Sequence, residues 1–425
     1  MTIAFINARL IDPENGTDKL GSVVVQDGII TEVVYGDNPH IQAEVIDCAG
    51  KCLAPGIIDI GVKVCEPGER HKESFASAGR AAAAGGVTTM VIRPDTKPAI
   101  DSPETLHFAH SRAVEDAGVN VHLMAALTVG RNGREMAEIG FLQDAGAVAF
   151  SDADSVIADN KIFGRCLTYA KGLNALVMGH IQEPSLSKGS AVTSGPFATK
   201  LGLPGASPMA ERIQLERDMA LVEMTGVKYH VDQISTAVAL PVLERAKAAG
   251  LNVTAGASIH HLTLNELDIE GYRTFFKVKP PLRHETDRVA TVDAVASGLI
   301  DIISSMHTPQ DEESKRLPFE EAASGAVGLE TLLPAAMQLV HGDYMDMPTL
   351  WRALSLNPAK LLGLAGGRLS KGAPADLVLF DPDKPFVLDR TTLKSKSKNT
   401  PFDGRRMQGV VLRTILAGQE IYKTE

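Results

Sequence analysis

The chain has 425 residues, of which 42 are basic and 52 acidic, so its formal net charge at pH 7 is −10. This length suits a full-sized barrel with a smaller second domain, and the acidic balance, with only 5% aromatic residues, argues against nucleic acid as a partner. The sequence has no apolar run of roughly 18 residues that would predict a membrane span, and four cysteines without a CxxC pair suit the reducing cytoplasm, where we expect the protein.

Residues 1–53 alternate apolar and polar positions around a turn at Asp27-Gly28, which predicts short β-strands. From residue 54 onward, apolar β-type runs alternate with helical patterns, as expected for βα units around a parallel sheet. The predicted strands cover residues 57–64, 87–92, 119–126, 147–151, 175–180, 227–235, 251–255 and 300–305. The helical patterns between them include residues 72–84, 210–225 and 237–249.

The last part of the chain, residues 367–425, again reads as β-strands. Neither terminal piece is long enough to form a stable sheet alone, so we expect both to build one small β-sandwich domain beside the barrel. The predicted architecture is α/β, a (β/α)₈ TIM barrel over residues 54–366, flanked by β-domain parts at 1–53 and 367–425. A Lys-Ser-Lys-Ser-Lys run within residues 393–400 predicts a solvated loop.

The chain resembles the bacterial class I dihydroorotases over nearly its whole length. The motifs that carry the resemblance lie at residues 55–59, 66–68, 79–89, 201–205, 260–264, 277–283, 328–331 and 375–379. The resemblance implies a TIM barrel of the metal-dependent amidohydrolase type. It also implies hydrolysis of a cyclic amide by a zinc-bound hydroxide, with a carboxylate as general acid and base. Such a metal needs about three protein ligands and an open position.

The family's metal and catalytic positions are largely lost in this chain. Aligned on the resemblance, the positions are occupied by Gly61, Lys63, Ala153, His180, Gln233 and Met306. Only His180 keeps a ligand, and Met306 stands where the family has its general acid and base. We therefore predict no metal site and no catalytic residue.

The family's substrate positions have changed as well, so that only a vestigial pocket is expected. Cys65 replaces an arginine that would bind the substrate carboxylate, and Asp95 replaces an asparagine and would repel that carboxylate. Lys279 replaces another asparagine, and His307 alone retains the family residue.

These losses predict a protein that is not an enzyme: a catalytically inactive dihydroorotase-like protein of pyrimidine biosynthesis, without a cofactor. The family contains non-catalytic chains that associate with aspartate carbamoyltransferase and support its assembly. The resemblance therefore implies the catalytic chain of aspartate carbamoyltransferase as the partner. We expect a homo-oligomer or hetero-oligomer, with no nucleic acid and no membrane bound.

Two alternatives stay open at this point. One is an active dihydroorotase or cyclic amidohydrolase with a rebuilt or metal-free site. The other is a regulator in which Lys63, Lys279 and His307 attract an anion. We disfavour an improvised metal site of histidines at the barrel mouth, because metal ligands need oriented hydrogen-bond partners. We also disfavour Cys65 as a nucleophile, since no spacing pairs it with a histidine.

Overall fold

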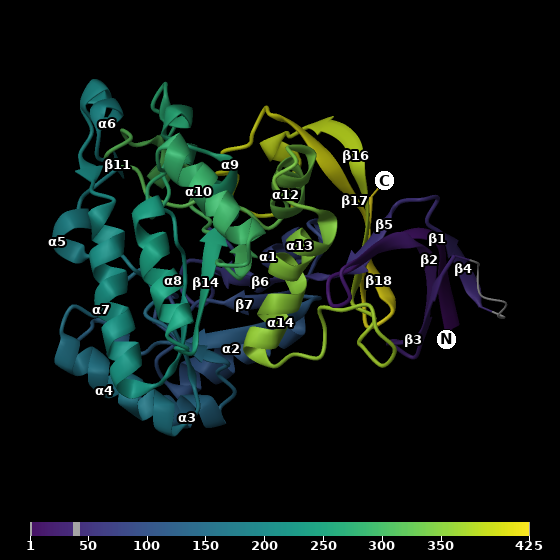
Figure 1. The fold of residues 1–425 in the computed structure, drawn as a ribbon, viewed down its shortest axis with the longest axis horizontal. Helices are drawn as coiled ribbons and strands as arrows, with labels where there is room; N and C mark the ends of the chain where they lie inside the picture. Colours follow the sequence, from purple (N-terminus) through teal and green to yellow (C-terminus); the bar gives the residue numbers. More distant parts are fainter. Residues whose placement is uncertain (1, 37–42, 425) are drawn as a thin grey trace.

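The computed structural model describes residues 2–36 and 43–424, and its larger body is a barrel of eight parallel strands (Figure 1). In order around the sheet these are β6 (Ile57–Val62), β7 (Val87–Ile92), β8 (Asn120–Ala125), β9 (Ala149–Phe150), β10 (Leu176–Gly179), β13 (Lys228–Val231), β14 (Val253–Ser258) and β15 (Ile302–Ser304). The first and last strands meet where the Lys63 amide donates to the His307 carbonyl oxygen at 2.9 Å. The eight strands follow the predicted order.

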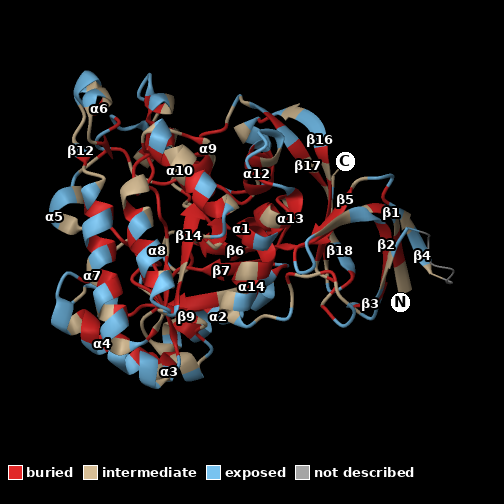
Figure 2. Cartoon of the chain, viewed as in Figure 1, coloured by how far each residue is buried: buried red, intermediate tan, exposed pale blue. Residues whose placement is uncertain are grey.

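Helices cover the outside of the barrel because they alternate with the strands along the chain. The longer outer helices are α1 (Phe75–Ala84), α2 (Pro103–Asp116), α3 (Ile139–Asp144), α4 (Asn160–Gly172), α7 (Met209–Thr225), α8 (Leu240–Ala248) and α10 (Glu285–Ala296). Local sequence sets their ends: Ser74, for example, caps α1 by accepting a hydrogen bond from the Ser77 amide. Every residue of β6 and β7 is buried, and these strands are red at the centre of Figure 2.

A second sheet, mostly antiparallel, is built from both ends of the chain. Its strands are β1 (Thr2–Asp12), β2 (Thr17–Gln26), β3 (Ile29–Tyr35), β4 (Glu44–Asp47), β5 (Cys52–Pro55), β16 (Leu377–Val387), β17 (Arg406–Leu416) and β18 (Gln419–Lys423). Strand β5 joins the two ends, since it pairs with β1 on one side and β16 on the other. The sheet stands beside the barrel and carries both termini (Figure 1). The predicted fold class is confirmed, and the domain boundaries stay predictions.

Shorter elements fill the loops and the seam between barrel and sheet. They are α5 (Pro184–Ser187), α6 (Pro196–Leu201), α9 (Ile259–Thr263), α11 (Glu312–Arg316), α12 (Leu332–His341), α13 (Met347–Trp351), α14 (Asn357–Leu362), β11 (Val192–Thr193), β12 (Gly205–Ala206), η1 (Val129–Arg131), η2 (Ala237–Ala239), η3 (Glu266–Ile269), η4 (Thr274–Phe276), the π-helical η5 (Arg352–Leu356) and η6 (Arg390–Thr392). Within the described residues, no helix combines the length and apolar character needed to cross a membrane.

The lysine- and serine-rich segment 393–400 is a loop, as predicted, but only its lysines face solvent. Ser395 and Asn399 are each only 2% exposed. The Ser395 hydroxyl donates to the Glu73 carboxylate, and the Ser395 amide donates to Glu330 at 2.9 Å. Asn399 donates to the carbonyl oxygens of Thr308 and Gly325. The segment therefore lies across the barrel next to the end of β15, and its alternation places serines inward.

Candidate functional site

Gly61 lies near the end of β6, and its missing side chain makes room for Met306, which follows the neighbouring strand β15. A Cβ atom on Gly61 would lie 2.5 Å from the Met306 sulfur and 3.0 Å from the Ser304 hydroxyl. Met306 is 6% exposed, and its backbone has a positive φ of 46°. Ala153, the other apolar replacement, is likewise buried with a φ of 52°. An apolar contact thus occupies the region that the family's ligands would line.

Lys63, just beyond β6, takes part in a buried charge cluster instead. Its ammonium lies 2.8 Å from the Asp95 carboxylate, and Arg93 donates to the same carboxylate at 3.2 Å. Burial raises the pKa of Asp95, but the positive charges of Arg93 and Lys63 outweigh burial and hold the pKa below its usual value. Two cations therefore share one ionised carboxylate at the ends of β6 and β7.

His180 follows β10, is 5% exposed, and lines a cavity. Its Nε2 atom has no hydrogen-bond partner among the described residues. Burial, with the nearby charge of Lys279, lowers the pKa of His180 to about 3. The imidazole is consequently uncharged near neutral pH and free to bind a ligand through Nε2.

The cavity beside His180 has a volume of about 590 Å³ and polar walls. Arg131, Asp154, Gln182 and Lys279 line it together with His180. Arg131 donates to the Asp154 carboxylate at 2.6 Å, and the Lys279 ammonium donates to the Asp154 carbonyl oxygen at 2.9 Å. These residues come from the loops at the C-terminal ends of the strands, where barrel enzymes place their sites.

The other predicted site residues do not reach this cavity. His307 is fully buried: its Nδ1 accepts from the Gly328 amide at 3.1 Å, and its Nε2 lies 3.4 Å from Glu73. Cys65 is 2% exposed, and burial raises the pKa of its thiol to about 12, so it stays protonated. Gln233 is 3% exposed at the end of β13. His307 and Cys65 are thus interior residues.

Below the cavity lies a second network, which the sequence did not reveal. Glu211 on α7 is fully buried and accepts hydrogen bonds from the Ser235 and Thr236 amides at 2.8 and 2.9 Å. The Arg283 guanidinium, 2% exposed, lies 3.3 Å from the same carboxylate. Glu211 and Arg283 are 72 residues apart, so no spacing rule links them. Gln182, two residues after His180, donates to Glu211 at 3.1 Å and so joins the His180 loop to this network.

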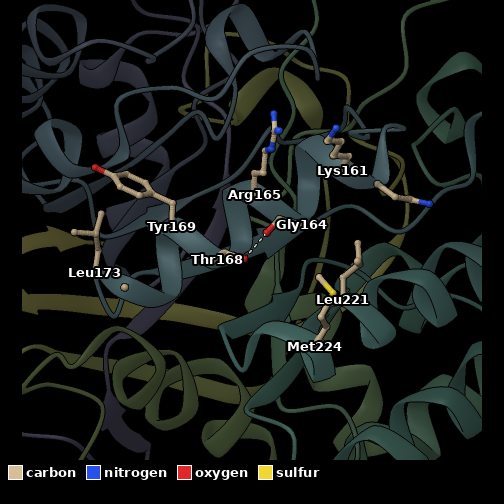
Figure 3. A pocket seen from close by; sticks show the side chains of 10 residues that line it. Lys161, Gly164, Arg165, Thr168, Tyr169, Leu173, Leu221 and Met224 are labelled. Carbon is tan, nitrogen blue, oxygen red and sulfur yellow. Dashed lines mark hydrogen bonds between the residues drawn. The ribbon is translucent and has the colours of Figure 1, made fainter.

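A larger hollow, about 870 Å³, lies on the outer surface between α4 and α7. Figure 3 shows the residues that line it, among them Tyr169, Leu173, Leu221 and Met224, with the Thr168 hydroxyl donating to the Gly164 carbonyl oxygen. Its walls are mainly apolar and hold no histidine, acid or cysteine. The polar cavity at the barrel mouth is therefore the candidate site.

The fold and the position of this cavity define the class of protein as a barrel of the amidohydrolase type. The Dihydro-orotase-like family matches residues 50–238, and the Amidohydrolase family matches residues 330–422. A Dihydroorotase of Ehrlichia chaffeensis is 38% identical over 100% of this chain and 96% of its own length. One of Pelobacter propionicus is 37% identical over the whole of both chains. The chain therefore belongs to the dihydroorotase-like family.

A solved structure supports the fold. The L-hydantoinase (dihydropyrimidinase) from Arthrobacter aurescens superimposes with a TM-score of 0.89 at 23% identity, over 99% of this chain and 96% of the hydantoinase. The likeness extends through both the barrel and the terminal sheet.

The relatives overturn two expectations. A catalytically inactive protein is the wrong prediction, because relatives that match this chain from end to end are named Dihydroorotase. A protein without any cofactor is also the wrong prediction, because the family to which the chain belongs uses zinc. Both predictions came from the loss of the family's metal ligands and substrate residues, which was taken to outweigh the resemblance of the whole chain.

The residues present do not fit the family's zinc. Within residues 2–36 and 43–424 no three His, Cys, Asp or Glu side chains are grouped to hold a metal ion. At the barrel mouth, Lys63 and Arg93 hold positive charge close to Asp95. The chemistry of the site is therefore derived from these side chains themselves.

The contact between Gly61 and Met306 can be tested by substitution. We expect Gly61→Ala to lower the free energy of unfolding by about 1–3 kcal/mol, because the added methyl group overpacks against the Met306 sulfur. The double variant Gly61→Ala, Met306→Ala should lose less than the sum of the two single variants. Chemical denaturation of all three measures this coupling. Gly172→Ala, with open space around it, is the control, and additive losses would contradict the contact.

Proposed function

We propose that the chain is a cyclic amidohydrolase that opens the ring of dihydroorotate at a rebuilt site. The observation that carries the proposal is the match to curated dihydroorotases over the full chain. A polar cavity at the C-terminal ends of the barrel strands, with an unpaired imidazole, supports it. This is the alternative that the sequence left open, an active dihydroorotase or cyclic amidohydrolase with a rebuilt or metal-free site.

In this proposal His180 acts in the cavity. The cluster of Lys63, Arg93 and Asp95 lies outside the cavity lining, and its two ion pairs hold the ends of β6 and β7 together. The uncharged His180 would hydrogen-bond the ring or the attacking water through Nε2.

Genetic complementation tests this function. In a bacterial strain that lacks its own dihydroorotase, we expect the wild-type chain to restore growth without added pyrimidines. His180→Ala should fail to restore growth, because among the described residues it removes the only imidazole that lines the cavity. His107→Ala, an exposed position on α2, is the matched control and should grow. Absence of growth with wild-type chain at normal soluble levels would contradict the proposal.

We further propose that the chain acts in the cytoplasm and binds the catalytic chain of aspartate carbamoyltransferase. The resemblance supports the partner, and four buried, unbridged cysteines support the reducing compartment. Light scattering of the mixed purified proteins should give one species heavier than either component. Two separate species at micromolar concentrations would contradict the association.

A further inference from the structure

Asp154 occupies the wall of the polar cavity as a carboxylate held by two cations. Arg131 donates to its Oδ1 at 2.6 Å, and Lys279 lies 3.4 Å from its Oδ2. The Asp154 and Lys279 side chains are 44% and 48% exposed, whereas Arg131 is 16% exposed. Burial raises the pKa of Asp154, but the charges of Lys279, Arg93 and Arg131 more than offset burial and lower it. Two cations thus surround a single ionised carboxylate that solvent can reach.

Both cations keep donors that Asp154 does not use. Arg131 donates from Nε to the Asp152 carbonyl oxygen at 3.1 Å and from Nη2 to the Asp154 carboxylate and the Ser155 hydroxyl. Its Nη1 donates to none of the described residues. Lys279 donates to two oxygens of Asp154, and an ammonium has three N–H groups. One side of this pair of cations is therefore open to a further acceptor.

A second, independent observation points to a ligand in the same cavity. His180 is 5% exposed, and its Nε2 has no hydrogen-bond partner within the described part of the chain. Leaving a buried polar atom unpaired destabilises the folded protein. Buried polar atoms in folded proteins nearly always find a partner. A ligand with polar ring atoms beside an acidic group would satisfy His180 and both cations together.

The position at which the family would bind the substrate carboxylate, at Cys65 and Asp95, offers no such binding. Cys65 is buried with a protonated thiol, and Asp95 is ionised and already paired with Lys63 and Arg93. Neither Cys65 nor Asp95 lines the cavity. Arg131 and Lys279 do line the cavity, and together with Asp154 they sum to one positive charge. Such a local excess attracts anions, although the chain as a whole carries −10.

We infer that Arg131 and Lys279 form a relocated subsite for the carboxylate of the cyclic substrate, and that Asp154 holds the two cations in place and competes with this carboxylate. The inference rests on the proposed function, because it names how that site selects a cyclic amide that carries an acidic group. The subsite provides specificity for dihydroorotate over the same ring without a carboxylate.

The test compares binding of two probes to the full-length chain by isothermal titration calorimetry. The probes are dihydroorotate and dihydrouracil, which share the ring and differ in the carboxylate. We expect wild-type chain to prefer dihydroorotate, and Arg131→Met and Lys279→Met each to weaken dihydroorotate binding by about 10- to 100-fold, the range for hydrogen bonds to charged groups. Dihydrouracil binding should change by less than about threefold, since it lacks the group that the cations bind.

Two further variants separate the subsite from general charge. Lys188→Met removes an exposed cation from the same cavity that makes no ion pair with Asp154, and it should leave the preference intact. Asp154→Asn removes the competing charge and should tighten dihydroorotate binding, which a purely structural role would not produce. Inorganic phosphate should compete with dihydroorotate less strongly than a compound with the same ring and its carboxylate does.

The outcomes distinguish this inference from the proposed function. A preference for dihydroorotate that Arg131→Met and Lys279→Met abolish, in a chain that never opens the ring, would keep the subsite and overturn the hydrolase. Ring opening in a chain whose preference survives both substitutions would keep the hydrolase and overturn the subsite. Equal binding of the two probes to the wild-type chain would also overturn the subsite.

Discussion

Glu211→Ala is expected to lower the free energy of unfolding by about 3–5 kcal/mol, because it leaves a buried guanidinium without its counter-charge. Glu211 is fully buried, and Arg283 beside it is 2% exposed. The Ser235 and Thr236 amides would lose their acceptor at the same time. Each buried donor left unpaired adds a desolvation cost.

Urea denaturation followed by circular dichroism measures this loss. Glu216→Ala on the same helix is the matched control: its side chain is 44% exposed and pairs with Arg245 at the surface, so we expect a loss below about 1 kcal/mol. Similar losses for the two variants would show that the Glu211 network does not stabilise the loops under the cavity.

Phe380→Ala is expected to cost about 3–5 kcal/mol, because it opens a cavity at the seam between barrel and terminal sheet. Phe380 on β16 is fully buried and stacks on Trp351 with ring centroids 4.8 Å apart and an angle of 12° between the rings. Trp351 in turn donates to the Pro55 carbonyl oxygen at 2.9 Å. One aromatic pair thus links both ends of the sheet to the barrel.

Trp351 is the only tryptophan of the chain, so its fluorescence reports on this seam. Phe380→Ala should change the emission of the folded protein and move the unfolding midpoint to lower urea. Phe386→Ala on the same strand is the control, since Phe386 is only partly buried, and it should cost less than half as much. Equal losses would contradict the importance of the seam.

The sequence predicted the fold well because barrel strands are short apolar runs between helices, and this pattern is local. Residues 87–92 were predicted as a strand, and β7 spans Val87–Ile92. The segment 393–400 was predicted as a solvated loop, because lysine and serine are polar. Ser395 is instead buried and hydrogen-bonds to Glu73 and Glu330, more than 60 residues away, which local composition cannot reveal.

The site was harder to predict, because it depends on contacts between distant loops. Sequence alignment pointed to Lys63, Asp95, His180 and Lys279, and the structure brings His180 and Lys279 to one cavity and pairs Lys63 with Asp95. Arg131 and Asp154 were missed as a pair, since their 23-residue separation has no motif. The functional prediction failed for a different reason: lost ligands were taken as lost activity, whereas the whole chain matches named dihydroorotases.

The most direct test of the proposed hydrolase is the initial rate of dihydroorotate ring opening by this chain, purified from a host that lacks its own dihydroorotase. Metal content is determined on the same sample, so that the rate refers to a defined protein. We predict a rate well above the uncatalysed reaction that His180→Ala abolishes. Ring opening no faster than the uncatalysed reaction, at any metal content, would contradict the proposed function.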